Sequence, residues 1–159
     1  MLQDVMHLTP EGFLKFQEEL NFLRTVRREE VANRLRVARE DGMYGENFAL
    51  ETAIEDQAFV EGRIQQLELL LGRARILDGN GHNGKLDSIC LNCKVTVCED
   101  GYAPETYHIV CSAEADPIQG KISDESPLGR ALLGRRVGDH VSVRAPGGSF
   151  SYEILSIEP

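Results

Sequence analysis

The sequence predicts an α+β protein in which a long N-terminal antiparallel helical hairpin is followed by a smaller antiparallel β domain. Up to residue 77 the apolar residues recur with the period of a coiled coil, whereas from residue 89 they alternate with polar residues, as in half-buried strands. A stretch rich in Gly and Asn, LDGNGHNGKLDS at 77–88, separates the two patterns. We therefore expect a coiled-coil domain at 1–77, a linker at 78–88 and a β domain at 89–159.

The first helix is expected to begin at Pro10 with Thr9 as its N-cap. Proline suits the first helical position, and a threonine side chain accepts a hydrogen bond from the free amides of the first turn. A polar interval at 27–30 interrupts the apolar stripe of this helix. The stripe consists of Phe13, Phe16, Leu20, Leu23, Val31, Leu35 and Ala38.

A second helix carries apolar residues at steps of three and four, which is the spacing of a coiled-coil seam. The predicted seam consists of Leu50, Ile54, Gln57, Val60, Ile64, Leu67, Leu71 and Ala74. Each helix has one apolar stripe and needs a partner, and the short connection at 41–46 makes its sequence neighbour the natural one. A coiled coil between two copies of the chain is the alternative. Because the hairpin satisfies the seam internally, we expect a monomer.

The second half of the sequence predicts several strands and one short helix. KVTVC at 94–98 and ETYHIV at 105–110 alternate, and HVSVRAPGGSFSYEILSI at 140–157 places two alternating runs around the turn APGGS. SPLGRALLG at 126–134 predicts a helix with Ser126 as N-cap and Pro127 at its first position. We interpret His108 and His140 as strand residues rather than catalytic groups.

Composition limits the classes of partner that the protein is expected to bind. The 159 residues contain no apolar run of the roughly 20 residues that cross a bilayer, and the first residues lack a secretion signal, so we expect a cytoplasmic protein with no membrane partner. A net charge of −9 argues against broad nonspecific binding to nucleic acid.

Six arginines fall within sixteen residues on the first helix: Arg24, Arg27, Arg28, Arg34, Arg36 and Arg39. They fit a solvated helix face with ion pairs such as Glu30–Arg34. They also fit a basic stripe that guides an anionic partner towards the turn, in which case Arg34, Arg36 and Arg39 lie nearest to that partner.

Four cysteines follow the pattern C-x2-C-x4-C-x12-C, at Cys90, Cys93, Cys98 and Cys111. The first pair has the spacing of zinc ligands, but no second pair matches it. Cys93 and Cys98 would point to opposite faces of a strand. We expect free thiols that pack as small hydrophobes and bind no structural metal, with zinc binding and redox chemistry as alternatives.

The connection between the helices, within AREDGMYGENFALETA at 38–53, places two glycines, Gly42 and Gly45, among carboxylates. These acids are Glu40, Asp41, Glu46 and Glu51. Acids on an exposed turn bury nothing, which indicates a role in function rather than in folding.

The chain resembles the Gre family of bacterial transcript-cleavage factors. The resemblance rests on four segments in both halves of the chain: EELNFLRTVRREEVANRLRVARE at 18–40, GMYGEN at 42–47, EDQAFVEGRI at 55–64 and ISDESPLGRALLGRRVGDHVSVRAPGGSFSYEILSIE at 122–158. It implies an N-terminal antiparallel coiled coil and a C-terminal domain similar to FKBP prolyl isomerases. It also implies a factor that docks on the RNA polymerase core through the C-terminal domain and inserts the coiled coil into the secondary channel.

In such a factor the tip carboxylates share a Mg²⁺ ion with the polymerase, whose own active site then hydrolyses backtracked RNA. The resemblance therefore implies a protein that is not itself an enzyme and binds no cofactor alone. Hard oxygen ligands suit Mg²⁺, which assigns Asp41 and Glu46 to the ion. Gly42, Gly45 and Asn47 would support the tip. The nascent RNA 3′ end would lie near Arg34, Arg36 and Arg39, and Asp124, Ser126, Pro127 and Leu128 would face the polymerase.

The tip departs from the family pattern G-D-L-x-E-N, because Met43 occupies the Asp position. A thioether is a poor ligand for Mg²⁺, so Asp41 would have to substitute by a change in the turn, which Gly42 and Gly45 permit.

Three function classes remain. They are a factor that stimulates cleavage, a secondary-channel regulator that does not, and a prolyl isomerase or chaperone. The third is the weakest, because a prolyl-isomerase pocket is normally lined with aromatic residues, which make up only 6% of this chain and include no Trp.

Overall fold

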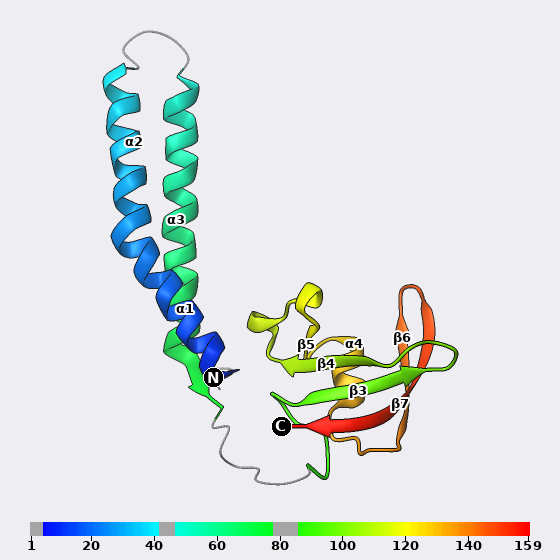
Figure 1. Ribbon diagram of the computed structural model, residues 1–159. Helices are drawn as coiled ribbons and strands as arrows, with labels where there is room; N and C mark the ends of the chain where they lie inside the picture. Colours follow the sequence, from blue (N-terminus) through cyan, green and yellow to red (C-terminus); the bar gives the residue numbers. More distant parts are fainter. Residues whose placement is uncertain (1–4, 42–46, 78–85) are drawn as a thin grey trace. The chain divides into compact units, whose positions relative to one another are not determined.

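The structure, a computed structural model, describes residues 5–41, 47–77 and 86–159, which form two compact units (Figure 1). One unit is the helical hairpin from Glu11 to Ala74, and the other is the β domain together with His7–Pro10. The predicted α+β class with an N-terminal hairpin is confirmed. The exact boundaries at residues 77 and 89 stay a prediction, because residues 78–85 lie outside the described ranges.

The first arm of the hairpin is a continuous helical run of three segments: α1 (Pro10–Phe22), a π-helical turn (Leu23–Arg27) and α2 (Arg28–Asp41). It begins at Pro10, as predicted. The sequence does not predict the π turn, in which the Arg28 amide donates to the Leu23 carbonyl, five residues back. The longer turn immediately precedes most of the polar interval at 27–30. Leu23 and Val31 are both buried although they lie eight residues apart.

The second arm is α3 (Phe48–Arg73), which packs on the first arm through Val60, Ile64 and Leu67. The predicted seam is wrong towards the tip, where Ala53 is 4% exposed and Ile54 is 48% exposed. Seven residues nearly complete two turns, so Ala53 lies about 20° around the helix from Val60. Ile54 and Val60 are six residues apart, which falls short of two full turns, so Ile54 lies about 120° around the helix from Val60.

The seam also differs from the prediction at other positions. Gln57 is exposed, and Leu50 and Leu71 are half-buried. Ala74 does not extend α3, because it begins the strand β2 (Ala74–Ile76), which pairs with β1 (Met6–Leu8) in a two-stranded sheet. None of the described helices is long and apolar enough to cross a membrane.

The β domain is a five-stranded sheet in the order β5-β4-β3-β7-β6 (Figure 1). Its strands are β3 (Lys94–Glu99), β4 (Glu105–Val110), β5 (Lys121–Ser123), β6 (His140–Ala145) and β7 (Gly148–Glu158). The β3–β4, β3–β7 and β6–β7 pairs are antiparallel, as expected. The expectation of an antiparallel domain is wrong at one edge, where β4 and β5 are parallel. Two short 3-10 turns, Ser112–Glu114 and Pro117–Gln119, lie in the connection that makes this crossover.

One short helix, α4 (Pro127–Leu132), covers the sheet and completes the core of the domain. Leu132 is fully buried together with Val95, Ile109 and Ile154. The helix begins as predicted, because the Gly129 amide donates to the Ser126 hydroxyl oxygen at 3.0 Å. A Cβ atom at Gly129 would lie 2.0 Å from the Ser123 carbonyl oxygen, so only glycine allows α4 to start this close to β5.

The observed seam yields a prediction with a matched pair of variants. Ala53→Asp buries a carboxylate between the arms and should lower the free energy of unfolding of the hairpin by about 2 kcal/mol or more. Ile54→Asp places the same side chain on the exposed face and should change it by less than about 0.5 kcal/mol. The measurement is denaturant unfolding followed by far-UV circular dichroism. Equal losses in both variants would contradict the observed seam.

Candidate functional site

The predicted catalytic tip is described only on its two flanks. Gly42, Met43, Gly45 and Glu46 lie outside the described residues. On one flank Asp41 is the last residue of α2, and its exposed carboxylate has no hydrogen-bond or ion-pair partner among the described residues. On the other flank Asn47 precedes α3.

The Asn47 side chain joins the two arms of the hairpin. Its Oδ1 accepts from the Leu50 amide at 3.1 Å, which caps the N-terminus of α3. Its Nδ2 donates to the Ala38 carbonyl oxygen at 2.7 Å, near the end of α2. A single half-buried amide thus fixes the distance between the two helix ends that carry the tip.

Five of the six clustered arginines form ion pairs with acids of the hairpin. Across the arms the pairs are Arg24–Glu68, Arg28–Glu61 and Arg34–Asp56, and within the first arm they are Arg27–Glu30 and Arg36–Glu40. The expected Glu30–Arg34 ion pair does not form. Instead, Nη1 of Arg34 lies 3.3 Å from Oδ2 of Asp56 on α3. The three pairs across the arms involve largely exposed side chains, so they set the register of the arms more than they add stability.

Arg39 differs from the other five. It is exposed in the last turn of α2 and has no ion pair within the described ranges. Of the three arginines predicted to contact RNA, Arg34 and Arg36 are already engaged by Asp56 and Glu40. Arg39 is therefore the most available of them for an anionic partner.

A groove of about 630 Å³ opens between α2 and α3 beside the tip. Apolar side chains of Val37, Ala38, Phe48 and Ala53 line it, and Asp41 lies among its polar residues. Phe48 is 76% exposed although it is large and apolar. Sequence reasoning missed this groove; the available signal was Phe48 itself, a bulky apolar residue that follows Asn47 and belongs to neither predicted stripe.

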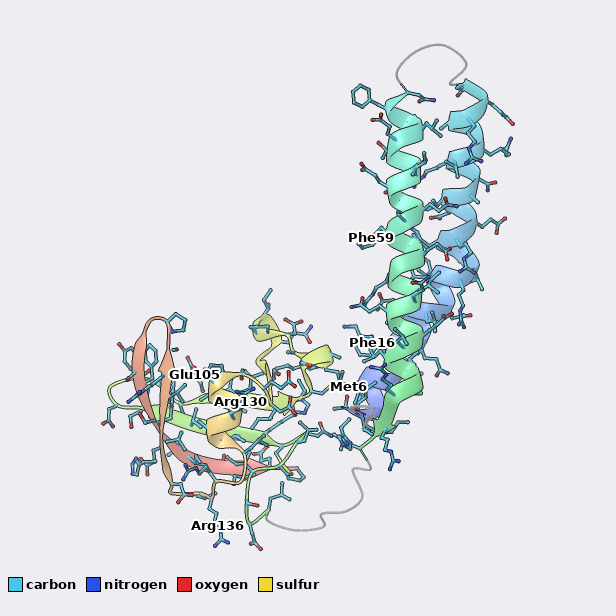
Figure 2. The ribbon with its side chains drawn as sticks, turned by 180° about the vertical axis from the view of Figure 1, so that it is seen from behind. Met6, Phe16, Phe59, Glu105, Arg130 and Arg136 are labelled. Carbon is cyan, nitrogen blue, oxygen red and sulfur yellow. A yellow bond between two sulfur atoms is a disulfide. The ribbon has the colours of Figure 1, made fainter. Side chains whose placement is uncertain are left out.

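A second exposed phenylalanine shares a face of α3 with Phe48. Figure 2 shows Phe59 on the side of α3 that points away from α2, and it is also 76% exposed. Eleven residues nearly complete three turns, so the two rings lie about 20° apart around the helix. The outer face of α3 thus presents aromatic surface that the hairpin does not bury.

The described residues offer one of the two predicted magnesium ligands. Within the described ranges, no group of three or more His, Cys, Asp or Glu side chains is placed to hold a metal ion. Asp41 supplies a hard carboxylate of the type that Mg²⁺ prefers, but a single carboxylate binds the ion weakly. A magnesium site here requires ligands from residues 42–46 or from another protein.

The residues predicted to face the polymerase lie at and just before the start of α4. The Ser126 hydroxyl caps this helix and donates to the Ser123 carbonyl oxygen at 2.6 Å. Leu128 is half-buried and packs against the core, whereas Pro127 is exposed. The Asp124 amide donates to the Val110 carbonyl oxygen at 2.9 Å. Folding accounts for Ser126 and Leu128, which leaves Pro127 as the most accessible residue of this set.

The cysteine expectation is wrong for the first pair, because Cys90 and Cys93 form a disulfide. The turn before β3 brings their Cα atoms to 5.6 Å, within the range that a disulfide spans. Cys98 and Cys111 are free. Burial raises the pKa of the Cys111 thiol, which keeps it protonated at neutral pH.

The β domain holds an aromatic hollow that is too small for a prolyl-isomerase pocket. Tyr102 and Tyr152 line it beside Glu99 and Glu105, and its volume is about 50 Å³. Pockets for small molecules usually measure roughly 300–1,000 Å³. The Tyr107 hydroxyl donates to Glu105, and burial raises the pKa of Tyr107, so this phenol stays neutral.

The two strand histidines do not form a catalytic pair in the described structure. Nε2 of His108 lies 2.6 Å from Oδ1 of Asn92, and burial together with Lys121 and Lys94 lowers its pKa. His140 begins β6 and is exposed. They occur in strands, as predicted.

Comparison with known proteins matches both halves of the chain. The family description "Transcription elongation factor, N-terminal" matches residues 6–76, and "Transcription elongation factor, GreA/GreB, C-term" matches residues 83–159.

Individual relatives match over nearly the full length. Transcription elongation factor GreA of Thermoanaerobacter pseudethanolicus is 48% identical over 151 residues, which cover 94% of this chain and 95% of the relative. The factor of the same name from Bacillus licheniformis is 44% identical over 155 residues, 98% of each chain. The crystal structure of GreA factor homolog 1 from Thermus thermophilus is 31% identical, covering 98% of this chain and 100% of that one, with a TM-score of 0.45.

The bridge made by Asn47 is testable by two substitutions at one position. Asn47→Ala removes both the cap and the bond to Ala38, and we expect it to lower the free energy of unfolding of the hairpin by about 1 kcal/mol or more. Asn47→Asp keeps the cap acceptor but loses the donor, so its loss should be smaller. The measurement is denaturant unfolding together with hydrogen exchange of the Leu50 amide. If Asn47→Asp is as unstable as Asn47→Ala, the cap contributes nothing.

Proposed function

Because this chain belongs to the GreA/GreB family of transcription elongation factors, we propose that it binds RNA polymerase and stimulates cleavage of backtracked RNA. The observation that carries this proposal is the family match over both the hairpin and the β domain, together with 48% identity to a relative named transcription elongation factor GreA. The protein acts on RNA polymerase and carries no active site of its own.

The two units have different roles in this proposal. The 26 residues of α3 make an arm of about 39 Å, long enough to reach into a channel of another protein. The hairpin enters the secondary channel, and the β domain, related to FKBP in fold, anchors the factor outside it near Asp124, Ser126, Pro127 and Leu128. The exposed ring of Pro127 supports this position for the anchor.

The tip contributes carboxylates to the active site of the polymerase. Asp41 and Glu46 are the residues that would hold a Mg²⁺ ion shared with that site, and Gly42, Gly45 and Asn47 support them. The ion would supply charge stabilisation and an activated water for phosphodiester hydrolysis. The role of the chain is to position these acids, and the bond from Asn47 to Ala38 supports that role.

The basic end of α2 lies beside the same tip. We assign the contact with the nascent RNA 3′ end to Arg34, Arg36 and Arg39, with Arg39 as the leading contact because it is exposed and unpaired among the described residues. Arg34 and Arg36 contribute only if they leave Asp56 and Glu40.

A second function is favoured by one specific observation, the methionine at position 43. If Glu46 alone cannot retain the shared ion, the same protein occupies the secondary channel and regulates transcription without stimulating cleavage. Both functions require binding to RNA polymerase, so cleavage distinguishes them.

The roles of the tip acids lead to a prediction on cleavage rate. Met43→Asp should raise the cleavage rate at least about tenfold, because a second carboxylate on the ion stabilises the transition state and 1.36 kcal/mol corresponds to about tenfold in rate. Glu46→Ala should abolish cleavage, and Asp41→Ala should slow it. The measurement is shortening of the RNA in defined backtracked complexes at fixed Mg²⁺ concentration.

Binding to core polymerase is the control for these variants, and all of them should co-elute with the enzyme as the parent does. A parent that cleaves rapidly and is indifferent to Asp41→Ala would contradict the two-carboxylate argument. A parent that binds polymerase, inhibits elongation and does not cleave would select the regulatory function. Failure to co-elute would reject both functions.

The arginines give a second prediction, with Arg36 as the matched control for Arg39. Arg39→Ala should weaken crosslinking of the factor to the RNA 3′ end more than Arg36→Ala, because Arg36 is already paired with Glu40. Binding to polymerase should change little in either variant. Equal crosslinking by both variants and the parent would mean that these arginines form only a solvated helix face.

A further inference from the structure

The turn before β3 holds the one disulfide of the described residues, at a point where three parts of the β domain meet. The Ile89 amide donates to the Arg135 carbonyl oxygen at 2.8 Å, and the Gly134 amide donates to the Ile89 carbonyl oxygen at 2.9 Å. Both bonds join the turn to the segment that follows α4. The turn also exchanges bonds with β4, from Asn92 to the Ile109 carbonyl at 2.7 Å and from Ile109 back to the Cys93 carbonyl at 3.0 Å.

We propose that Cys90 and Cys93 form a thiol–disulfide exchange site whose redox state controls how firmly this turn holds the end of α4 and β4. The proposal is independent of the tip chemistry. It rests on the position of the pair, the unequal exposure of its two sulfurs and the hydrogen bond that one sulfur accepts.

The two sulfurs have different roles in the exchange. Cys93 is 1% exposed, whereas Cys90 is half-buried, so an incoming thiolate reaches Cys90 first. The Cys90 amide donates to Sγ of Cys93 at 3.3 Å. This bond stabilises negative charge on Cys93 Sγ, which makes Cys93 the better leaving group.

The reductant is a dithiol, and the reaction balances in two steps. One thiolate of the dithiol attacks Sγ of Cys90, which breaks the Cys90–Cys93 bond, forms a mixed disulfide and releases the Cys93 thiolate. The second thiolate of the dithiol then attacks the first sulfur of the same molecule, which is bonded to Cys90, closes the disulfide of the reductant and releases the Cys90 thiolate. The dithiol is oxidised by two electrons to its disulfide, and its two protons end on Cys90 and Cys93.

The other two cysteines do not compete for this role. Cys98 lies within β3, where its Sγ is directed to the backbone carbonyls of Glu99 and Tyr102 at 3.5 and 3.4 Å. Cys111 is 5% exposed, and its thiol lies against the carboxylate of Glu114. Cys98 is partly exposed and free, which makes it the matched control for Cys90.

Reduction should loosen the turn rather than unfold the domain. Ile89 stays in the apolar core with Leu132 and Ile154, whichever state the sulfurs take. Without the covalent bond, the four backbone hydrogen bonds of the turn open more often, because a disulfide restricts the open ensemble. The amides of Ile89 and Gly134 report this opening directly.

The experiment uses the full chain, equilibrated with mixtures of reduced and oxidised dithiothreitol, then acid-quenched, denatured and alkylated for mass spectrometry. Two thiols per chain, Cys98 and Cys111, should be labelled at the oxidising end, and all four at the reducing end, in a single two-electron transition. Cys98→Ser should remove one label at both ends and leave the transition in place. Amides of Ile89 and Gly134 should exchange faster in the reduced native protein.

A second pair of variants tests which sulfur is attacked. Native Cys93→Ser protein should form a mixed disulfide at Cys90 with oxidised glutathione, whereas Cys90→Ser protein should form none at the buried Cys93. Four labelled thiols at every ratio, or one equivalent of zinc bound by the reduced pair, would overturn the proposal. Equal reaction of both variants, or unchanged amide exchange on reduction, would overturn the assigned roles.

Discussion

The mutual burial of one narrow apolar seam holds the hairpin together, and the position of its tip depends on that contact. Neither arm can bury its stripe alone, and helices within proteins owe most of their stability to tertiary packing rather than to helix propensity. Towards the tip the seam ends in Ala38 and Ala53, which fill little space, and the groove beside them follows from those small side chains. Phe48 and Val37 border the groove from outside the seam, so apolar surface remains exposed at the end of the hairpin next to the tip.

Charged pairs then select one register along a seam that apolar contacts alone would leave open to sliding. Arg28 makes two bonds with Glu61, at 2.8 and 2.9 Å, and Arg63 makes two with Glu19, at 2.7 and 3.0 Å. A forked guanidinium matches a carboxylate in only one relative position, so such pairs specify geometry more than they stabilise. Because the register is fixed, Asn47 comes opposite Ala38 and can close the end of the hairpin.

Local chemistry in the sequence was sufficient for the helix starts and for most of the strands. Pro10 and the Ser126–Pro127 pair begin helices because they meet the needs of a first turn wherever the helix packs. Features that depend on packing were missed: the π turn after Phe22, the burial of Ala53 rather than Ile54, and the parallel β4–β5 edge. The closure of Cys90 on Cys93 also depends on a turn geometry that spacing alone left open. The roles of the tip acids rest on resemblance, because residues 42–46 lie outside the described ranges.

Because most of the clustered arginines form ion pairs, the cluster attracts nucleic acid less strongly than its composition suggests. Six arginines within sixteen residues suggest an electropositive surface, but five of them face carboxylates of the same hairpin, and the chain carries a net charge of −9. Affinity for nucleic acid grows with the number of phosphates neutralised. A hairpin whose described residues leave only Arg39 of this cluster without an ion pair therefore has little attraction for free RNA. Contact with RNA then requires that another interaction first bring the tip of the hairpin close to the RNA. The proposed docking of the β domain on RNA polymerase would supply such an interaction. It would keep an acidic factor away from unrelated transcripts and leave Arg39 available for the RNA 3′ end at the polymerase.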